Sequence, residues 1–162
     1  MIHRATKAAV LLGALATSAC TNPAQTTSGA PGTVTAGPNP ATPAYFQTTI
    51  GDRVLFPVDQ SNLTAEAQST LNGQASWLNQ NIHYGATIQG HADEQGTREY
   101  NLALGARRAS AVQEYLISRG VAGTRVDTVT FGKERPLEVC SEESCYARNR
   151  RAVTAIKTVP GS

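Results

Sequence analysis

The chain has 162 residues, with 14 basic and 12 acidic side chains that leave a formal net charge of +2. This length suits one modest folded domain, and a charge so near neutral gives no reason to expect a nucleic acid as partner. Most of the positive excess lies in Arg148, Arg150 and Arg151, a short cluster that equally fits a solvated strand end.

Residues 1–19 have the pattern of a secretory signal peptide. A basic start precedes an apolar run from Ala8 to Ala16, which is too short to span a bilayer as a mature helix. Small residues then lead to Cys20, which suits lipoprotein processing with an acylated cysteine as the mature N-terminus. Thr17 stands where a leucine-like residue is usual, so ordinary cleavage that leaves a free thiol is the alternative.

Residues 20–48 are predicted to be the acylated N-terminus and a disordered tether. The segment from Thr21 to Thr48 is rich in Pro, Gly, Ala, Ser and Thr and has no apolar periodicity. Such a composition cannot bury enough apolar surface to offset the entropy lost on ordering. As a flexible coil the tether would span about 30 Å. A folded domain is then expected over residues 49–158.

The domain begins with a short strand and a helix. Arg53 to Phe56, with Val58, reads as a strand that Pro57 interrupts, and proline restricts such a strand to a sheet edge or a bulge. Thr64 is the expected N-cap of the first helix. The apolar face of this helix consists of Leu71, Ala75, Leu78 and Ile82, and Trp77 beside it is expected in the core.

The later elements repeat this alternation. Residues 86–89 form the next strand, residues 102–119 a helix that ends at Gly120, and residues 125–131 and 151–159 two further strands. The inward face of the second helix is predicted to contain Ala109, Val112 and Leu116. The order is βαβαββ, so the predicted fold class is an α+β two-layer sandwich with both helices on one face of a mixed sheet.

The most informative stretch runs from Ile88 to Ala109. It places Asp93 on a turn that contains Gly96, and then continues into the helix that carries Arg108. A carboxylate and a guanidinium that face each other across a gap suit a zwitterion, because one accepts from an ammonium and the other grips a carboxylate. The alternative is that the two residues simply form a structural ion bridge.

The same stretch carries a family resemblance. From Gly90 to Ala109 the chain reads G-H-A-D-E-x-G-T-x-E-Y-N-x-x-L-G-x-R-R-A. This pattern resembles the peptidoglycan-associated lipoproteins, within the wider OmpA-like C-terminal domain family. The resemblance covers about Val54 to Ile156, including the stretches 132–136 and 149–152, which we hypothesise to shape a surface for a protein partner.

The resemblance implies a ligand and its binding residues. In this family the acid and the arginine bind diaminopimelate, the branched diamino acid of the peptidoglycan stem peptide. Carried over, Asp93 would hold the ammonium and Arg108 the neighbouring carboxylate, while Asn101 and Leu104 would lie beside the ligand. Asp59 matches an acidic position that lines the pocket. Relatives often have a further acid two positions earlier, where this chain has proline.

Two cysteines and two histidines invite other interpretations. Cys140 and Cys145 lie close together before the last strand, and an exported domain makes a disulfide the default, worth about 2 kcal/mol. A metal site is the competing interpretation, but neither His83 nor His91 has ligand spacing from this pair, so no metal or cofactor is expected. His91 beside Asp93 could act as a general base, although a hydrogen-bonded structural role is more usual.

The leading functional hypothesis is a non-catalytic anchor of the Tol-Pal system, with roles in cell division and envelope integrity. Palmitate and further acyl chains on Cys20 would hold the periplasmic face of the outer membrane, a leaflet that the family associates with residues such as Thr21 after the cysteine. The domain would bind peptidoglycan and, by resemblance, a periplasmic Tol propeller protein.

The alternative hypothesis is a periplasmic enzyme that cleaves peptidoglycan. It would pair Glu94 or Glu99 with Asp93, since glycoside cleavage needs two carboxyl groups at a defined separation. Acids crowded on one loop beside Arg108 favour ionised carboxylates, which argues against a general acid there. The sequence therefore favours binding over catalysis.

Overall fold

The computed structural model describes residues 39–139 and 141–159. They belong to one compact unit of the chain, Ala36–Ser162. The predicted signal peptide, the acylated Cys20, the tether up to residue 38 and Cys140 lie outside the described residues. The predictions that concern them therefore stay predictions.

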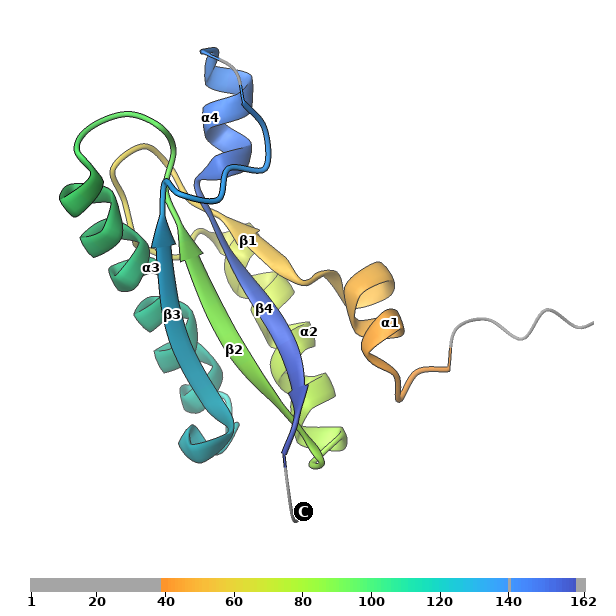
Figure 1. The fold of residues 1–162 in the computed structure, drawn as a ribbon. Coiled ribbons are helices and arrows are strands. Elements are labelled where there is room, and N and C mark those ends of the chain that lie inside the picture. The colour runs from red at the N-terminus through yellow and green to blue at the C-terminus, as the bar shows by residue number, and fades with distance from the viewer. Residues whose placement is uncertain (1–38, 140, 160–162) are drawn as a thin grey trace, which may run out of the picture. The chain divides into compact units, whose positions relative to one another are not determined.

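The described unit is a four-stranded sheet with its two long helices on one face. Its elements in order are α1 (Pro43–Tyr45), a π-helical segment (Phe46–Gly51), β1 (Arg53–Leu55), α2 (Ala65–Gln80), β2 (Tyr84–His91), α3 (Arg98–Ser118), a 3-10 turn (Gly123–Arg125), β3 (Val126–Gly132), α4 (Glu143–Asn149) and β4 (Arg151–Thr158). The strand order is β1-β4-β2-β3, with β2 and β3 parallel and β4 antiparallel to both of its neighbours. Helices α2 and α3 lie on the same face of the sheet (Figure 1). The predicted α+β fold class is confirmed.

This topology gathers three irregular segments at one end of the sheet. Strands β1, β2 and β3 all finish there, and β4 starts there. Figure 1 shows the β1–α2 loop, the β2–α3 loop and α4 together at that end. Residues that are far apart in the sequence therefore meet beyond the ends of the strands.

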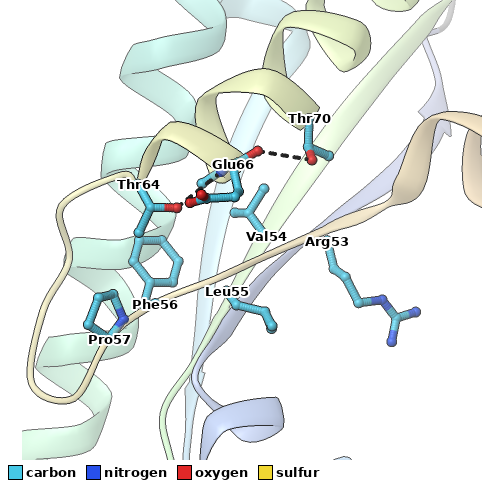
Figure 2. A pocket seen from close by; sticks show the side chains of 9 residues that line it. Arg53, Val54, Leu55, Phe56, Pro57, Thr64, Glu66 and Thr70 are labelled. Atoms are coloured by element: carbon cyan, nitrogen blue, oxygen red, sulfur yellow. Dashed lines mark hydrogen bonds between the residues drawn. The ribbon is translucent and has the colours of Figure 1, made fainter.

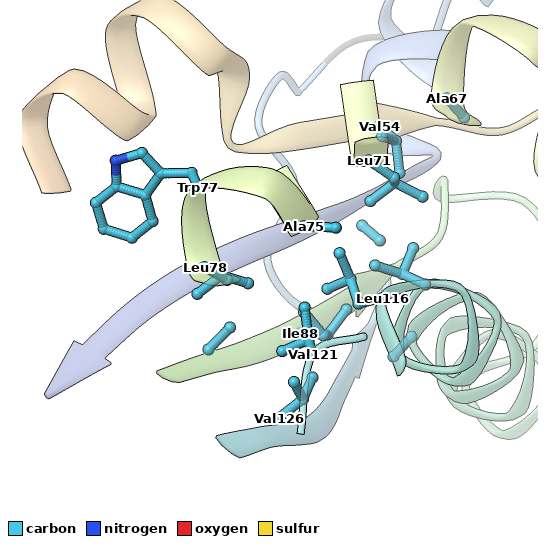
Figure 3. Close-up of a cluster of buried hydrophobic side chains, with 14 of the residues drawn as sticks. Val54, Ala67, Leu71, Ala75, Trp77, Leu78, Ile88, Leu116, Val121 and Val126 are labelled. Carbon is cyan, nitrogen blue, oxygen red and sulfur yellow. The ribbon is translucent and has the colours of Figure 1, made fainter. Parts of the chain in front are cut away.

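The apolar core lies between the sheet and the two helices (Figure 3). Helix α2 contributes its predicted stripe and Trp77, α3 contributes its own predicted stripe, and the sheet contributes Ile88 and Val126. Each large aliphatic side chain in such a position contributes about 2 kcal/mol through its burial. The prediction for Ile82 is wrong: this residue is 62% exposed, because α2 ends at Gln80 before its stripe would reach it.

Local capping sets the helix bounds. The Thr64 hydroxyl accepts from the Ala67 amide at 3.2 Å, as the sequence predicts for an N-cap. Helix α3 begins earlier than predicted because Thr97 caps it, accepting from the Tyr100 amide at 3.2 Å. It ends at Ser118, and the predicted stop residue Gly120 follows its C-cap with a φ of +92°, which is accessible to glycine. None of the helices in the described ranges combines the length and the apolar character that crossing a bilayer requires.

The first strand is an edge strand, as Pro57 predicts. β1 pairs with β4 alone and ends at Leu55, earlier than the sequence indicates. The Phe56 amide still donates to the Arg150 carbonyl at 2.9 Å. Proline then ends the pairing, because it has no N–H to donate. The chain that follows turns away from the sheet edge toward α2.

The folded part begins before the predicted boundary at residue 49. Phe46 is fully buried and its ring lies 5.0 Å from that of Trp77. The Trp77 indole donates to the Pro40 carbonyl at 2.7 Å. The prediction of a disordered tether is therefore wrong for residues 39–48, because Phe46 enters the core and Tyr45 packs against it.

Candidate functional site

A cavity of about 270 Å³ opens at the end of the sheet where β1 and β2 finish. Its walls come from the chain after β1, the β2–α3 loop and the first turns of α3. The lining residues are Val58, Asp59, Asp93, Gln95, Gly96, Tyr100, Asn101 and Leu104. The structure thus brings together four of the predicted ligand-binding residues, namely Asp59, Asp93, Asn101 and Leu104.

Asp93 follows directly after β2 and is nearly buried. One carboxylate oxygen, Oδ1, accepts from the Gln95 amide at 3.2 Å, and the other, Oδ2, accepts from Nη1 of Arg150 at 3.1 Å. The loop can turn so tightly because Gly96 has a φ of +85°. Each carboxylate oxygen has a second lone pair, so Asp93 can still accept from a cation in the cavity.

Asp59, in the chain after β1, lines the cavity in an unusual backbone conformation. Its φ of +55° makes it the single non-glycine residue with positive φ among those described. Such a conformation costs about 1 kcal/mol or more and persists where the surroundings enforce it. The Tyr100 hydroxyl donates to the Asp59 carboxylate, and this bond joins the chain after β1 to α3 across the rim of the cavity.

Asn101 and Leu104 form the floor of the cavity from the first turns of α3. Both are buried. The Asn101 side-chain amide donates to the Gln95 carbonyl at 2.6 Å, which ties the Asp93 loop to the helix. Leu104 supplies an apolar surface beside the two carboxylates. The floor therefore holds the shape of the loop and excludes water on one side.

Arg108 lies behind the wall of the cavity instead of lining it. It is fully buried. Its Nε donates to the Gln60 carbonyl at 2.8 Å, Nη1 to the His91 carbonyl at 2.8 Å and Nη2 to the Pro57 carbonyl at 3.2 Å. A guanidinium has five N–H groups, so one remains on each terminal nitrogen. Burial lowers the pKa of Arg108 to about 10, while the charge of Asp93 opposes this shift, and the group stays cationic at neutral pH.

Asp93 forms its ion pair with Arg150 and not with Arg108. The pair joins Oδ2 to Nη1 at 3.1 Å, and both side chains are almost completely buried. No direct Asp93–Arg108 bridge is present among the described ion pairs, so the alternative interpretation of these two residues as a structural bridge is not supported.

Arg150 is the buried partner of Asp93 that the sequence interpretation missed. Burial opposes its charge, but the hydrogen bonds that Arg150 donates to Glu143 and Asp93 outweigh that effect and raise the pKa of Arg150 above its ordinary value. Arg151 is buried too. The interpretation of this cluster as a solvated strand end is therefore wrong for Arg150 and Arg151, because the antiparallel register of β4 places its first residues at the cavity end.

Neither Glu94 nor Glu99 lines the cavity with Asp93. One carboxylate oxygen of Glu94 accepts from the buried Asn149 side chain at 2.6 Å. Glu99 is exposed in the first turn of α3. The carboxylate pair that a peptidoglycan-cleaving enzyme would need is therefore not assembled by these residues.

His91 is buried at the end of β2, 2% exposed. Its ring lies against that of Phe131, and within the described part of the chain neither ring nitrogen has a hydrogen-bond partner. Burial lowers its pKa to about 4, with the nearby charges of Arg151 and Arg135 acting in the same direction. The residue is thus neutral at pH 7 and packs against Phe131 inside the domain, which does not favour a general base.

A second hollow, of about 390 Å³, lies along the open edge of β1 (Figure 2). Its lining includes Arg53, Leu55, Thr64 and Glu66. Figure 2 shows the Arg53 side chain pointing away from the other lining residues, and its guanidinium bonds to Asp52 at 2.8 Å. The charges of this hollow do not converge on one space, so it is the weaker candidate.

The remaining sequence predictions, on metal binding and on a disulfide, concern residues outside the cavity. No group of three or more His, Cys, Asp or Glu side chains within 39–139 and 141–159 could hold a metal ion. Cys145 lies in α4. Its predicted partner Cys140 is outside the described residues, so this disulfide stays a prediction.

The sequence of this domain is similar to that of a known protein family. Residues 55–150 match the OmpA family. A peptidoglycan-associated lipoprotein of Rhizobium meliloti is 54% identical over 123 residues, which cover 74% of this chain and 70% of the relative. One from Brucella melitensis is 45% identical over 158 residues, 96% of this chain and 94% of the relative.

Solved structures with a similar fold include another peptidoglycan-associated lipoprotein. The crystal structure of the peptidoglycan-associated lipoprotein from Burkholderia pseudomallei has a TM-score of 0.68 and 33% identity, and the match covers 74% of this chain and all of that one, 100%. The C-terminal domain of Helicobacter pylori MotB has a TM-score of 0.62, with 17% identity, over 67% of this chain and 86% of that chain. The second likeness concerns the fold alone.

Proposed function

The chain belongs to the OmpA family and, within it, to the peptidoglycan-associated lipoproteins, and from this membership we propose that it binds peptidoglycan without cleaving it. The ligand that we propose is the side-chain end of diaminopimelate in the stem peptide. The protein would hold the outer membrane to the cell wall from the periplasmic face.

The observation that carries this proposal is the pair of carboxylates in one small cavity. Asp59, from the chain after β1, and Asp93, from the β2–α3 loop, both line it. Two carboxylates in a partly closed space favour an ammonium ion, because each can form a charge-assisted hydrogen bond with it. The apolar surface of Leu104 would contact the methylene chain of the ligand.

Arg108 would act on the carboxylate that neighbours the ligand ammonium. Its guanidinium is held in place by three backbone carbonyls, and one N–H on each terminal nitrogen is left over. Two such donors on a rigid plane match the two oxygens of a carboxylate. Arg108 lies fully buried beside the cavity, and we propose that the adjoining wall moves when the ligand binds, so that the ligand carboxylate contacts these donors.

The arrangement of the acids supports binding without turnover. Glycoside cleavage requires one carboxyl group that can give a proton to the leaving group and a second that acts on the sugar. Here Asp59 accepts from Tyr100, and Asp93 accepts from Arg150 and the Gln95 amide. Both acids are held as acceptors, which suits a cationic ligand.

The membrane end of the anchor rests on Cys20. The Brucella relative aligns with 96% of the chain, and this coverage supports a shared N-terminal region. Each buried acyl CH₂ contributes about 0.8 kcal/mol, so several palmitate-type chains would hold the protein durably in the outer membrane. The wall contact would stay exchangeable, and many copies together would join the two layers by avidity.

A role in the Tol-Pal system follows from the same family membership. We propose that the cavity end also meets a periplasmic Tol propeller protein, in competition with peptidoglycan. Such competition would couple the outer-membrane linkage to constriction during cell division. Cross-linking from the exposed Leu137 in cells, with and without that partner, would test this part of the proposal.

Sedimentation with purified diaminopimelate-type sacculi tests the central part. The wild-type chain should pellet with the sacculi, and Asp93→Asn should remain in the supernatant. Asp127→Asn is the matched control, because Asp127 is an exposed acid at the start of β3, where it pairs with Lys157 away from the cavity. Equal pelleting of all three proteins, or release of soluble fragments from the sacculi, would contradict the proposal.

A further inference from the structure

We propose that Arg150 is a positioning residue that orients Asp93 and sets the preference of the cavity for a ligand with both an ammonium and a carboxylate. This inference rests on the proposed function, because it concerns the same cavity. It assigns a role to a residue that does not line the cavity itself.

Two consecutive residues between α4 and β4, the last residue of α4 and its C-cap, hold two consecutive acids of the β2–α3 loop. The Asn149 amide donates to Glu94 at 2.6 Å, and Arg150 donates to Asp93 at 3.1 Å. Asn149 in turn accepts from the amides of Leu137 and Glu138 at 2.7 and 3.2 Å. We call Asn149 and Arg150 the clasp, since together they attach the Asp93 loop to the segment around α4.

Arg150 also reaches the other walls. Its Nε donates to the Phe56 carbonyl at 3.3 Å, at the start of the chain that leads to Asp59. Its Nη2 forms an ion pair with Glu143 in the first turn of α4. One guanidinium therefore connects β1, the Asp93 loop and α4. A side chain with so many fixed partners can hold a carboxylate in one orientation.

The orientation of Asp93 depends on this contact. The carboxylate has two described donors, the Gln95 amide on Oδ1 and Arg150 on Oδ2. Without Arg150, Oδ2 would lose its fixed position, and the carboxylate could rotate about its terminal bond. An ammonium in the cavity would then meet a mobile acceptor and bind less tightly.

The charge of Arg150 supplies the second part of the inference. Three buried charged side chains are coupled at this wall: Asp93, Arg108 and Arg150. Asp59 at the cavity and the exposed Glu143 beside Arg150 are further charged partners, and buried charges are only weakly screened by salt. The two buried guanidinium groups face the side of the cavity where the ligand carboxylate would lie. Removing Arg150 would take one positive charge from this wall and should penalise the ligand carboxylate more than the ligand ammonium.

Calorimetric titration with two probes separates positioning from a merely structural role. The probes are a muramyl tripeptide that ends in meso-diaminopimelate and the same tripeptide ending in L-lysine, which lacks the side-chain carboxylate. The full chain in detergent should prefer the diaminopimelate probe. Arg150→Met should weaken that probe about tenfold, the effect of losing a charge-assisted hydrogen bond, and should weaken the lysine probe less. The ratio of the two affinities should therefore fall.

Two further variants make the result specific. Arg148→Met is the matched control, because Arg148 pairs with Glu138 at the surface, where its side chain is 60% exposed, and both affinities should stay unchanged. Arg150→Lys keeps the charge but loses the planar fork, so it should keep the preference between probes better than Arg150→Met. If Arg150→Met does not fold, as thermal melting would reveal, Arg150→Lys decides, with a loss of about threefold expected for the diaminopimelate probe.

The Gln95 amide gives an independent readout of Asp93. Its NMR shift should change in the Arg150 variants and not in Arg148→Met, because it donates to the same carboxylate. An equal loss for both probes, or unchanged affinities in the Arg150 variants, would overturn this inference alone. Failure of the wild-type chain to bind either probe would overturn the proposed function as well.

Discussion

The middle of the domain and its cavity end are held together by different forces. In the middle, aliphatic side chains such as Leu71 and Leu116 fill the space between the helices and the sheet. At the cavity end, the buried side chains include Arg108, Asn149 and Arg150, which must be matched by hydrogen bonds. Apolar packing supplies stability and tolerates exchange, whereas a buried polar network fixes orientation at a cost in desolvation. The comparison indicates that the polar network at the cavity end holds side chains in fixed orientations, whereas the apolar middle supplies most of the stability.

The largest expected effect concerns the apolar middle. Leu116→Ala should reduce the free energy of unfolding by about 4 kcal/mol, because it removes a fully buried side chain and leaves a cavity. The affinity of the remaining folded protein for a muropeptide should be unchanged. Urea denaturation and calorimetry measure the two quantities. The neighbouring Ile117→Ala, at an exposed position of α3, is the control and should alter neither.

The next effect concerns pH and the neutral His91 at the border of the two regions. Its pKa is lowered to about 4 in the folded chain from an ordinary 6.5, so the unfolded chain takes up the proton first as the pH falls. This contribution to stability is complete above pH 6.5 and is lost between pH 6.5 and 4, by about 3 kcal/mol at the lower end.

Denaturation of wild type and His91→Leu across this pH range measures the contribution. The variant should lose less stability on acidification than the wild type does. His83→Leu is the control, since His83 is exposed, and it should lose as much as the wild type. Identical acid sensitivity in all three proteins would show that His91 is not the group responsible.

Arg108→Lys should weaken both binding and stability. A lysine keeps the charge but cannot reproduce the three carbonyl contacts of the guanidinium. We expect about thirtyfold weaker muropeptide binding and a loss of about 2 kcal/mol in unfolding free energy, since buried acceptors are left unsatisfied. Titration and urea denaturation give the two numbers. Full retention of binding would argue against a two-pronged contact with the ligand carboxylate.

The smallest effect is expected at the rim. Tyr100→Phe removes the hydrogen bond to Asp59, which should weaken muropeptide binding about threefold and leave the melting temperature nearly unchanged, because the site is exposed. Tyr115→Phe is the control, because the Tyr115 hydroxyl donates to the side-chain oxygen of Asn72 in α2 at 3.0 Å and Tyr115 does not line the cavity. A larger loss in the control would place the ligand elsewhere.

The sequence predicted what depends on local patterns. Most of the helix stripes, the Thr64 cap and the turn at Gly96 follow from spacing alone, which places Asp93 on a turn before the second helix. The family resemblance added Asp59, Asn101 and Leu104, and the structure brings all four residues to one cavity. That these residues bind a ligand is still a prediction.

The features that the sequence missed depend on distant partners. Arg150 meets Asp93 only because β4 runs antiparallel to β1 and β2 in a particular register. Arg108 is buried because Pro57 and Gln60, about fifty positions earlier, turn their carbonyls toward it. Residues 39–48 have a linker-like composition, yet Phe46 packs on Trp77. Spacing along the chain carries no signal for such contacts.

The most direct test of the proposed function is whether Asp93 binds the free ammonium group of the ligand. Calorimetric titration of wild type and Asp93→Asn would use a diaminopimelate muropeptide and the same muropeptide acetylated on its side-chain amine. The account predicts that acetylation and the substitution each weaken binding at least about thirtyfold, and that together they cost little more than either alone. Tight binding of the acetylated muropeptide by the wild type would contradict it.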